Sequence, residues 1–366
     1  IVGGDAESRG VVSTCSYEAR RFGVHCAMAS AEARRLCPQA IWTHGHFDRY
    51  REVSAQVMAI LADETPRVER VSIDEAFIDI TPGRFAPEDP LLVARRISDR
   101  VAALGVTCSI GVGCNKTVAK IASERDKPFG LTIVRPGTEQ RFLAALPVSA
   151  MSGIGRSAEE RLRRMRIYTL GELSRAPEST LAAIFGVNGE RMRQRALGLE
   201  VSEVTSLDEE REVKSVSNER TFAKDLTERG DIEAAIALLG ESVGRRLRRQ
   251  GLTGATVTLK LKYSYGSGRS AQRRLPHPTD DENIFVAVAL ELLDNIWQEG
   301  MHVRLAGIGM SDFDHQGGIQ TDLFCEIDDR GAQSSDRRDL SVAIDAVRDK
   351  FGDTALSFGR QSRFND

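Results

Sequence analysis

Apolar residues recur at helical and strand spacing, in alternation, through the first 136 residues. Apolar side chains three and four positions apart predict amphipathic helices at 50–62, 90–103 and 115–124. Runs rich in β-branched residues predict strands at 68–80, 106–112 and 130–134. This order of elements indicates an α+β fold in which helices cover one face of a sheet.

The pattern changes twice in the second half of the chain. Between 143 and 199, glycines interrupt short helices, and 201–212 is polar and acidic, which is typical of a linker between domains. Four strands and two helices then follow in the order β-α-β-β-α-β, the split βαβ arrangement of a four-stranded sheet. We expect these strands at 213–222, 256–263, 269–275 and 305–313, the helices at 232–250 and 282–298, and a last helix at 340–351.

Length and composition set broad limits. At roughly 150 residues per domain, 366 residues predict two or three domains, and 41% hydrophobic with 28% charged residues is typical of a soluble globular chain. No apolar run approaches the roughly 20 residues of a membrane span, and no secretory signal is present. The six cysteines contain no C-x-x-C pair, which favours reduced thiols. We expect a cytoplasmic protein with no membrane partner.

The charge is distributed in blocks. A net charge of −3 argues against a nucleic-acid partner, but residues 213–275 hold 13 Lys and Arg against 6 Asp and Glu. The linker before them holds five acids and one Arg. The basic module therefore predicts a polyanionic partner that the net charge conceals.

Two adjacent carboxylates, Asp74 and Glu75, stand inside the apolar run VSIDEAFIDI at 71–80. Burying them is costly unless a cation compensates their charge. Mg²⁺ is commonly held by one or two carboxylates and substrate phosphates. A strand end that exposes both acids, or intramolecular ion pairs, would explain them equally well.

The surrounding motifs decide between these interpretations. SIDEAFID at 72–79, SIGVGCNKTVAKIAS at 109–123, KPFG at 127–130 and YEARRFGV at 17–24 resemble, in order and spacing, motifs of the Y-family, translesion DNA polymerases. The resemblance extends from residue 1 to about 325 and is closest to bacterial members. It implies template-directed, error-prone synthesis in DNA damage tolerance, by two-metal transfer of dNTPs to a primer 3′ end.

The resemblance also implies roles for individual residues. Asp74 and Glu75 would be the catalytic metal ligands for two Mg²⁺ ions, with Mn²⁺ as a substitute. The incoming dNTP would be bound by Thr14, Tyr17, Arg20 and Lys127. Without the surrounding motif, a helix with a solvated basic face would be the better explanation of Tyr17 and Arg20.

Two basic regions would contact primer-template DNA. Gly153 and Gly155, before a basic helix, are typical of a helix-hairpin-helix whose backbone N–H groups meet phosphates, although such glycines also serve ordinary turns. SVSNERTF at 215–222 resembles the family's first little-finger strand, which indicates DNA contacts by Lys214, Arg220 and Thr221. Further phosphate candidates on strands are Lys260, Lys262, Arg269 and Arg273, whereas at least two of Arg245, Arg246, Arg248 and Arg249 are expected to be solvated.

A short peptide in the tail, Gln320 to Phe324, resembles the Q-x-x-L-F peptide that binds the bacterial sliding clamp. Gln320, Leu323 and Phe324 would dock in an apolar groove. A tail with two incidental apolar residues is the alternative, since five-residue motifs occur by chance.

The resemblance implies a right-hand polymerase that is most simply a monomer. We expect fingers at 1–45, a ferredoxin-like palm at 46–136, a helical thumb at 137–200, a linker at 201–213, a βαββαβ little finger at 214–314 and a tail at 315–366. The protein would act at the bacterial nucleoid.

Other interpretations explain less. A P-loop requires Gly where Asn115 precedes Lys116, and His44-x-His46 lacks partners at metal-ligand spacing. A nucleotidyl cyclase would not need the glycine hairpin or the clamp-like peptide. A non-catalytic relative that recruits other factors to DNA would not need both Asp74 and Glu75.

The family begins with a strand that carries an Asp-x-Asp-like motif and an aromatic pair, and nothing in this sequence corresponds to it before Ile1. We expect that an N-terminal piece precedes this sequence. Without it, the chain would bind primer-template DNA but incorporate nucleotides poorly. In the family, that strand also carries the side chain that screens against ribonucleotides.

Overall fold

The computed structural model describes the chain except for residues 6, 8, 85–87, 208, 210–211, 265, 314–329, 353–354 and 357–366, and it describes 330–339 by backbone only. The chain divides into two compact units. One contains residues 1–45 and 211–366, and the other contains residues 46–210. Each unit has two hydrophobic cores of its own.

The segment 1–45 is built around a short antiparallel pair, β1 (Val2–Gly3) and β2 (Val12–Thr14). Helix α1 (Tyr17–Arg20) begins where the Ser16 hydroxyl accepts a hydrogen bond from the Ala19 N–H, and α2 (Ser30–Leu36) follows. Small apolar residues form the core beneath them: Val12, Cys15, Ala19, Val24, Met28, Ala33 and Cys37.

Residues 46–136 contain the predicted helices, with the predicted bounds met closely. These are α3 (Phe47–Glu64), α4 (Pro90–Ala103) and α5 (Lys116–Arg125). The strands are shorter than predicted and form two ladders instead of one continuous sheet. Strands β3 (Val68–Arg70) and β4 (Ala76–Ile78) are antiparallel, while β5 (Ile110–Val112) and β6 (Leu131–Ile133) are parallel.

The prediction of one strand over 68–80 was wrong, because this segment is a hairpin. The N–H groups of Val71 and Ser72 both donate to the Glu75 carbonyl, which closes a turn between β3 and β4. Ser and Asp side chains favour such turns because they hydrogen-bond to the nearby backbone. The Asp74 N–H donates to the Ser72 hydroxyl at 3.2 Å.

Helix α5 lies directly on β5 because one strand residue, Gly111, and the residue that follows the strand, Gly113, are glycines. A Cβ on Gly111 would lie 2.0 Å from the Ala119 carbonyl oxygen, and one on Gly113 would lie 2.6 Å from Val118 Cγ1. Asn115 is the N-cap of α5, with its side-chain oxygen accepting from the Val118 N–H at 3.0 Å. The residue that breaks the P-loop pattern therefore starts this helix.

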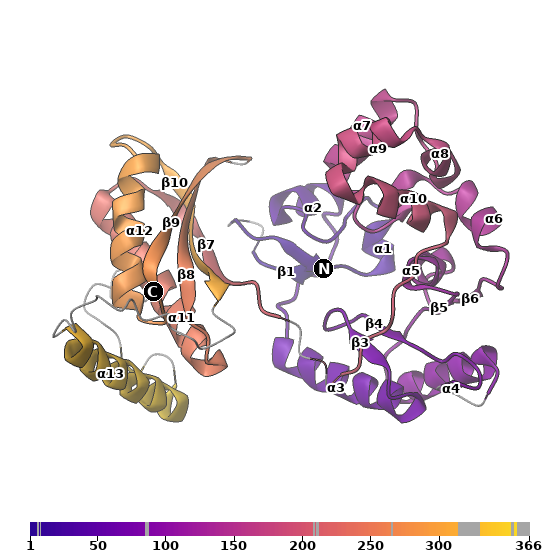
Figure 1. Cartoon of the computed structure of the whole chain (residues 1–366), viewed down its shortest axis with the longest axis horizontal. Coiled ribbons are helices and arrows are strands. Elements are labelled where there is room, and N and C mark those ends of the chain that lie inside the picture. The colour runs from indigo at the N-terminus through magenta and orange to yellow at the C-terminus, as the bar shows by residue number, and fades with distance from the viewer. Residues whose placement is uncertain are drawn as a thin grey trace, which may run out of the picture. The chain divides into compact units, whose positions relative to one another are not determined.

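Residues 139–197 form a helical bundle of α6 to α10, and Figure 1 shows α7 to α10 packed together. Its core contains fully buried leucines such as Leu162, Leu170 and Leu181. Helix α8 begins with a capping box between Thr169 and Glu172. The helices are α6 (Glu139–Ala144), α7 (Arg156–Arg164), α8 (Leu170–Arg175), α9 (Glu178–Phe185) and α10 (Gly189–Leu197).

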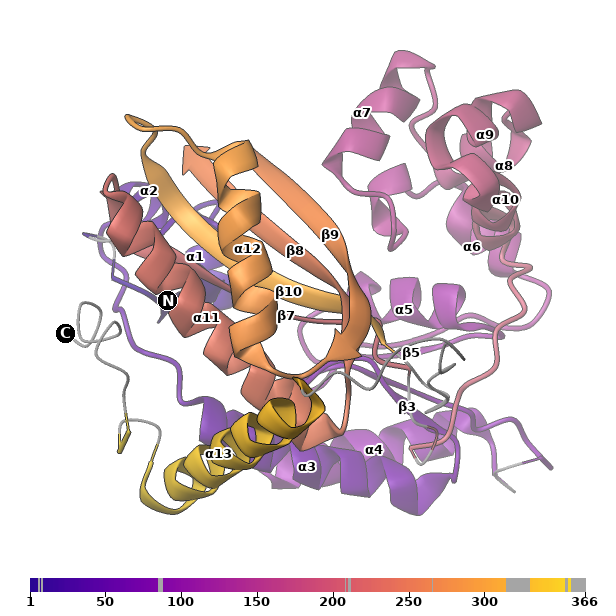
Figure 2. The same ribbon diagram turned by 60° about the vertical axis from the view of Figure 1, so that its left-hand side comes forward.

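The predicted β-α-β-β-α-β order is confirmed in residues 215–313. The strands pair in the order β7-β10-β8-β9, with every pair antiparallel. Helices α11 and α12 cover one face of this sheet (Figures 1 and 2). The elements are β7 (Ser215–Leu226), α11 (Arg229–Gln250), β8 (Gly254–Ser264), β9 (Ser267–Thr279), α12 (Glu282–Ile296) and β10 (Val303–Phe313).

The last helix, α13 (Arg330–Phe351), begins ten residues before its predicted start and lies beside α11 (Figure 2). Ion pairs join the two helices, with Asp345 and Asp349 contacting α11 arginines and Arg348 contacting Glu241. None of the helices that the structure describes is long and apolar enough to cross a membrane.

Candidate active site and nucleic-acid interface

Asp74 and Glu75 lie in the turn between β3 and β4. Helix α3 fixes this turn, because the Ser54 hydroxyl donates to the Ile73 carbonyl at 2.5 Å. The Ser72 hydroxyl donates to Asp74 Oδ1 at 2.5 Å, which orients that carboxylate. Asp74 is exposed and Glu75 is half-buried, so the cost of burial expected from a strand interior does not arise.

Glu75 is contacted by a lysine from α5. Lys120 Nζ contacts Glu75 Oε1, and it lies 3.4 Å from Glu124 Oε1. Burial alone would lower the pKa of Lys120, but its hydrogen bond to Glu75 and the nearby carboxylate charges outweigh burial and raise that pKa. Lys120 therefore remains charged beside Glu75.

Lys127 follows α5 and is held by Glu124, with 2.6 Å between Lys127 Nζ and Glu124 Oε1. Burial would raise the pKa of Glu124, but the hydrogen bond and charge of Lys127 lower it. The structure thus connects two of the predicted residues, Glu75 and Lys127, through side chains of α5 that sequence reasoning did not single out.

These residues can supply part of a metal site. Among the residues that the structure describes, no group of three or more His, Cys, Asp or Glu side chains could hold a metal ion. Asp74 and Glu75 nevertheless present two adjacent, accessible carboxylates, and Lys120 shows that Glu75 already attracts a cation. Two such oxygen donors fit Mg²⁺, which completes its shell with water and substrate phosphates.

Thr14, Tyr17 and Arg20 belong to the other unit and are all exposed there. The Arg20 guanidinium lies 5.8 Å from the centre of the Tyr17 ring, so the two side chains form one patch at the end of β2 and on α1. A planar guanidinium beside an exposed ring suits a ligand with phosphate and apolar parts.

The glycine hairpin before α7 has the expected backbone. Gly153 has φ +93°, which requires glycine, and Gly155 is the N-cap of α7 without a side-chain hydrogen bond. Glycine has no side chain that could accept hydrogen bonds from the N–H groups in the first turn of α7. Arg156, the first residue of this helix, is highly exposed.

Arg195 joins this hairpin to α5, a connection that sequence reasoning missed. Its Nε donates to Thr117 Oγ1 at 2.8 Å, and its Nη1 and Nη2 donate to the Ser152 carbonyl at 2.8 Å and the Ser152 hydroxyl at 2.9 Å. Burial lowers the pKa of Arg195. No local pattern distinguishes this arginine from the solvated ones around it.

The sheet of residues 215–313 has an open face opposite α11 and α12. Alternation places Ser217, Glu219 and Thr221 of β7 on this face. On the neighbouring strand β10, Gly309 lies opposite Ser217 and Gly307 lies opposite Glu219. Lys260 pairs with Glu219 across Gly307, with 2.7 Å between Nζ and Oε1. A hollow of about 220 Å³ lies there, between residues of β7, β10 and β8.

Three predicted phosphate contacts lie on the other face of this sheet. Arg220 is paired with Ala306, and Arg269 and Arg273 are paired with Leu261 and Val257, all of which are buried on the helix side. Arg273 contacts Glu291 of α12. Strand alternation thus places Arg269 and Arg273 on the face opposite Lys260 and Lys262, whereas Arg274 joins those lysines on the open face.

As predicted, two of the four arginines near the end of α11 are exposed. The ion pairs that three of the four form with α12 or α13 were not predicted. Arg246 and Arg249 are exposed, whereas Arg245 and Arg248 are largely buried against α13. Arg248 contacts Glu282 at 2.5 Å and Asp345 at 2.7 Å. Acids of α13 and α12, not solvent, meet most of these charges.

Of the remaining residues singled out from the sequence, those of the clamp-binding-like peptide are not described by the structure, and the others are exposed. Gln320, Leu323 and Phe324 lie outside the described residues. Lys214, just before β7, is exposed, as are His44 and His46.

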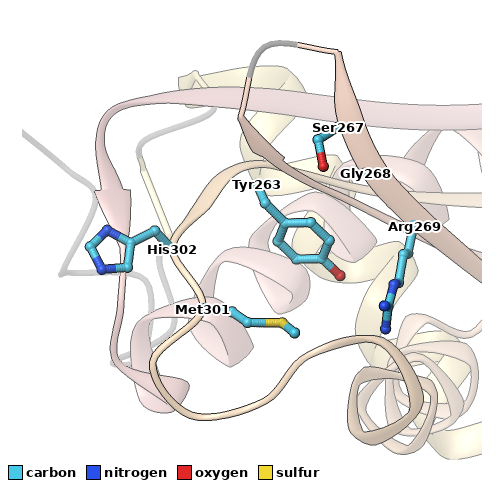
Figure 3. Close-up of a pocket in the computed structure, with 6 residues that line it drawn as sticks. All are labelled: Tyr263, Ser267, Gly268, Arg269, Met301 and His302. Carbon is cyan, nitrogen blue, oxygen red and sulfur yellow. The ribbon is translucent and has the colours of Figure 1, made fainter.

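A cavity of about 360 Å³ lies at one end of the same sheet. Figure 3 shows the Tyr263 ring with Met301 and Arg269 beside it. The Tyr263 hydroxyl donates to the Ile296 carbonyl, and burial raises its pKa. None of the residues predicted for catalysis or nucleotide binding lines this cavity.

Comparison with known proteins gives a consistent result. Residues 1–124 match the impB/mucB/samB family, and residues 213–323 match the C-terminal domain of that family. DNA polymerase IV of Lactococcus lactis subsp. cremoris (strain MG1363) is 39% identical over 307 residues, which cover 83% of this chain and 84% of that protein. DNA polymerase IV of Dehalococcoides mccartyi (strain CBDB1) is 35% identical over 368 residues, which cover 100% of this chain and 92% of that protein.

Solved structures show the same fold. A Y-family DNA polymerase chimera of Dbh and Dpo4 has a TM-score of 0.72 at 24% identity, over 85% of this chain and 90% of that one. DinB from Sulfolobus solfataricus has a TM-score of 0.53 at 23% identity, with the same coverage. The multi-domain α+β architecture expected from the motifs is thereby confirmed.

Proposed function

We propose a two-metal mechanism for this chain, which belongs to the Y family of DNA polymerases, the impB/mucB/samB family. It is a DNA-directed DNA polymerase that performs translesion DNA synthesis, and the reaction of such polymerases depends on divalent metal ions. Its similarity to DNA polymerase IV proteins supports the enzyme over a non-catalytic recruiter of the same family.

Asp74 and Glu75 are proposed as the carboxylates that hold two Mg²⁺ ions, with Mn²⁺ able to replace them. When bound, the ions activate the primer 3′-hydroxyl and stabilise charge on the leaving pyrophosphate. Ser72 orients Asp74 by its 2.5 Å hydrogen bond, and Lys120 neutralises Glu75 until the substrate arrives. The observation that carries this proposal is the accessible pair of adjacent carboxylates in a turn that Ser54 fixes.

The dNTP triphosphate is proposed to bind Thr14, Tyr17 and Arg20 from the segment 1–45, and Lys127 from the end of α5. Arg20 offers a planar fork to phosphate oxygens, and Lys127 offers a point charge. The exposure of Thr14, Tyr17 and Arg20 supports this assignment, because each is available to a ligand.

Primer-template DNA is proposed to bind through its backbone at two surfaces. The first is the hairpin of Gly153 and Gly155, where N–H groups suit a phosphate. The second is Lys214 and Thr221 with the open face of the sheet, where small residues admit a phosphate backbone closely. Arg220, predicted as a third contact, lies on the helix face and is left out of this surface. Such contacts are independent of sequence, as a polymerase that moves along DNA requires.

We assign fingers to 1–45, palm to 46–136, thumb to 137–200, linker to 201–213 and little finger to 214–314. A sliding clamp is the proposed partner of Gln320, Leu323 and Phe324. We also propose that the protein works in damage tolerance at the bacterial nucleoid, which its similarity to bacterial DNA polymerases supports.

Single-nucleotide primer extension tests the mechanism. We expect extension with Mg²⁺ that EDTA abolishes and that Asp74→Ala removes, while Asp74→Ala still binds primer-template DNA. The assay is run with and without the family's Asp-x-Asp strand placed before Ile1. Extension by Asp74→Ala at the rate of the parent chain would refute the role of Asp74.

A further inference from the structure

Lys120 and Lys127 share one oxygen atom of Glu124. Lys127 Nζ lies 2.6 Å from Glu124 Oε1, and Lys120 Nζ lies 3.4 Å from the same atom while also contacting Glu75. The four side chains form a row of alternating charge, here called the charge row: Glu75, Lys120, Glu124 and Lys127. Their side chains are between 28% and 48% exposed, so substrates can reach them.

The backbone that carries the charge row is held firmly. Helix α5 packs on β5 without room for a Cβ at Gly111, and a Cβ at Gly130 would lie 2.2 Å from the Asp126 carbonyl oxygen. Asp126 also accepts a hydrogen bond from the Thr132 hydroxyl of β6 at 2.7 Å. Any rearrangement in the charge row is therefore confined to side chains.

Lys120 has two possible carboxylate partners within reach. Glu124 lies one helical turn after Lys120 on the same face of α5, so the flexible ammonium can transfer from Glu75 to Glu124 by changing rotamer. A divalent cation bound at Glu75 would repel the Lys120 ammonium at this short distance. Glu124 is the acceptor that remains.

We propose that Glu124 is a positioning residue that couples cation binding at Glu75 to dNTP binding at Lys127, an inference that rests on the proposed roles of those two residues. Before a cation arrives, Glu124 holds Lys127 away from substrate. When Lys120 pairs with Glu124 instead of Glu75, the Glu124 carboxylate accepts hydrogen bonds from two ammonium groups and binds Lys127 less tightly. Lys127 is then released to the triphosphate.

This coupling has a signature that loss of structure would not produce. Glu124→Gln frees Lys127 in advance, so the variant binds dNTP more tightly than the parent chain when divalent metal is absent. It also leaves Lys120 on Glu75, so the variant needs more Mg²⁺ to reach half-saturation. Both constants should change about threefold, the scale of a half-exposed ion pair.

The experiment measures binding of a fluorescent dNTP to the chain on a dideoxy-terminated primer-template, in EDTA and across a Mg²⁺ titration. No bond forms in this assay, so binding is observed without turnover. Glu233→Gln on α11, which removes a half-exposed acid paired with Arg229 four residues before it, is the matched control and should leave both constants unchanged. Separate KM and kcat values for Glu124→Gln should show the effect mainly in KM.

The outcomes separate this inference from the proposed mechanism. Weaker dNTP binding in EDTA by Glu124→Gln, or no change in either constant, would overturn the role of Glu124. Glu75→Gln serves as the second variant. If it leaves the half-saturating Mg²⁺ concentration unchanged, the metal role of Glu75 fails, and the coupling fails with it.

Discussion

Arg248 of α11 donates from Nε to Asp345 of α13 at 2.7 Å, and both side chains are largely buried. The pair joins the last helix to the helical layer of the four-stranded sheet, across 97 residues of sequence. Because the inner face of α13 carries Ser341, Asp345 and Arg348, the two helices meet through charge instead of through an apolar seam.

Asp345→Ala is expected to loosen α13. Hydrogen exchange of the amides at 340–351 should become about 30-fold faster, equivalent to about 2 kcal/mol, since Arg248 keeps Glu282 as a partner. Exchange in β8 and β10 should stay unchanged. Lys350→Ala, an exposed change on the same helix, is the control, and equal exchange in both variants would contradict this account of α13.

Glu64 predicts a pH-dependent contribution to stability. Hydrogen bonds from Arg96, opposed by burial and helped by the charges of Arg96 and Arg100, lower the pKa of Glu64 below 4.5. The ionised carboxylate therefore stabilises the fold above the unfolded pKa, and this stabilisation is lost as the pH falls through the folded pKa. Glu64→Gln should cost about 2 kcal/mol at pH 7 and progressively less below pH 4.5, as urea titrations at several pH values would show.

Gly111→Ala should separate α5 from β5. The added Cβ would lie 2.0 Å from the Ala119 carbonyl oxygen and 2.3 Å from the Ser123 nitrogen, and backbone atoms cannot move aside cheaply. We expect a loss of about 3 kcal/mol in urea unfolding. Gly155→Ala, where a Cβ meets nothing within 4 Å and φ is −83°, should cost only about 1 kcal/mol, because Ala is a poorer N-cap residue than Gly. A stable Gly111→Ala protein would contradict this packing.

The two faces of the little-finger sheet should differ in DNA binding. Lys262→Ala, on the open face, should weaken primer-template binding severalfold and lower the slope of log affinity against log salt by about 1. Arg273→Ala removes the same charge from the helix face, where Glu291 already pairs with it, and should change neither quantity. Fluorescence anisotropy across a salt series measures both, and equal effects of the two variants would reject the open face as the DNA surface.

Long periodic segments made the little finger predictable. Its helices and strands hold one pattern for many residues, so the four-stranded sheet followed from their order, and α4 was predicted to the residue. The hairpin at Asp74 was missed because apolar β-branched residues flank a turn that Ser72 creates through its side chain. Periodicity does not record such a local hydrogen bond.

The contacts that were missed join residues far apart in sequence. Arg195 reaches Thr117 across 78 residues, and Arg245 reaches Asp349 across 104. Each arginine lies in a helix where neighbouring basic residues look the same from sequence alone. Only the packing of the elements distinguishes a buried charge from a solvated one.

The role of Asp74 as a metal ligand is tested most directly by changing the ligand atom. Asp74→Cys replaces a hard oxygen with a soft thiolate, so single-nucleotide extension with Mg²⁺ should fall by at least about 100-fold. Replacing Mg²⁺ with Mn²⁺ or Cd²⁺ should restore part of the rate in Asp74→Cys, while Asp74→Ala stays inactive with every metal. Extension by Asp74→Cys at the parent rate with Mg²⁺, or equal rescue of Asp74→Ala, would contradict the account.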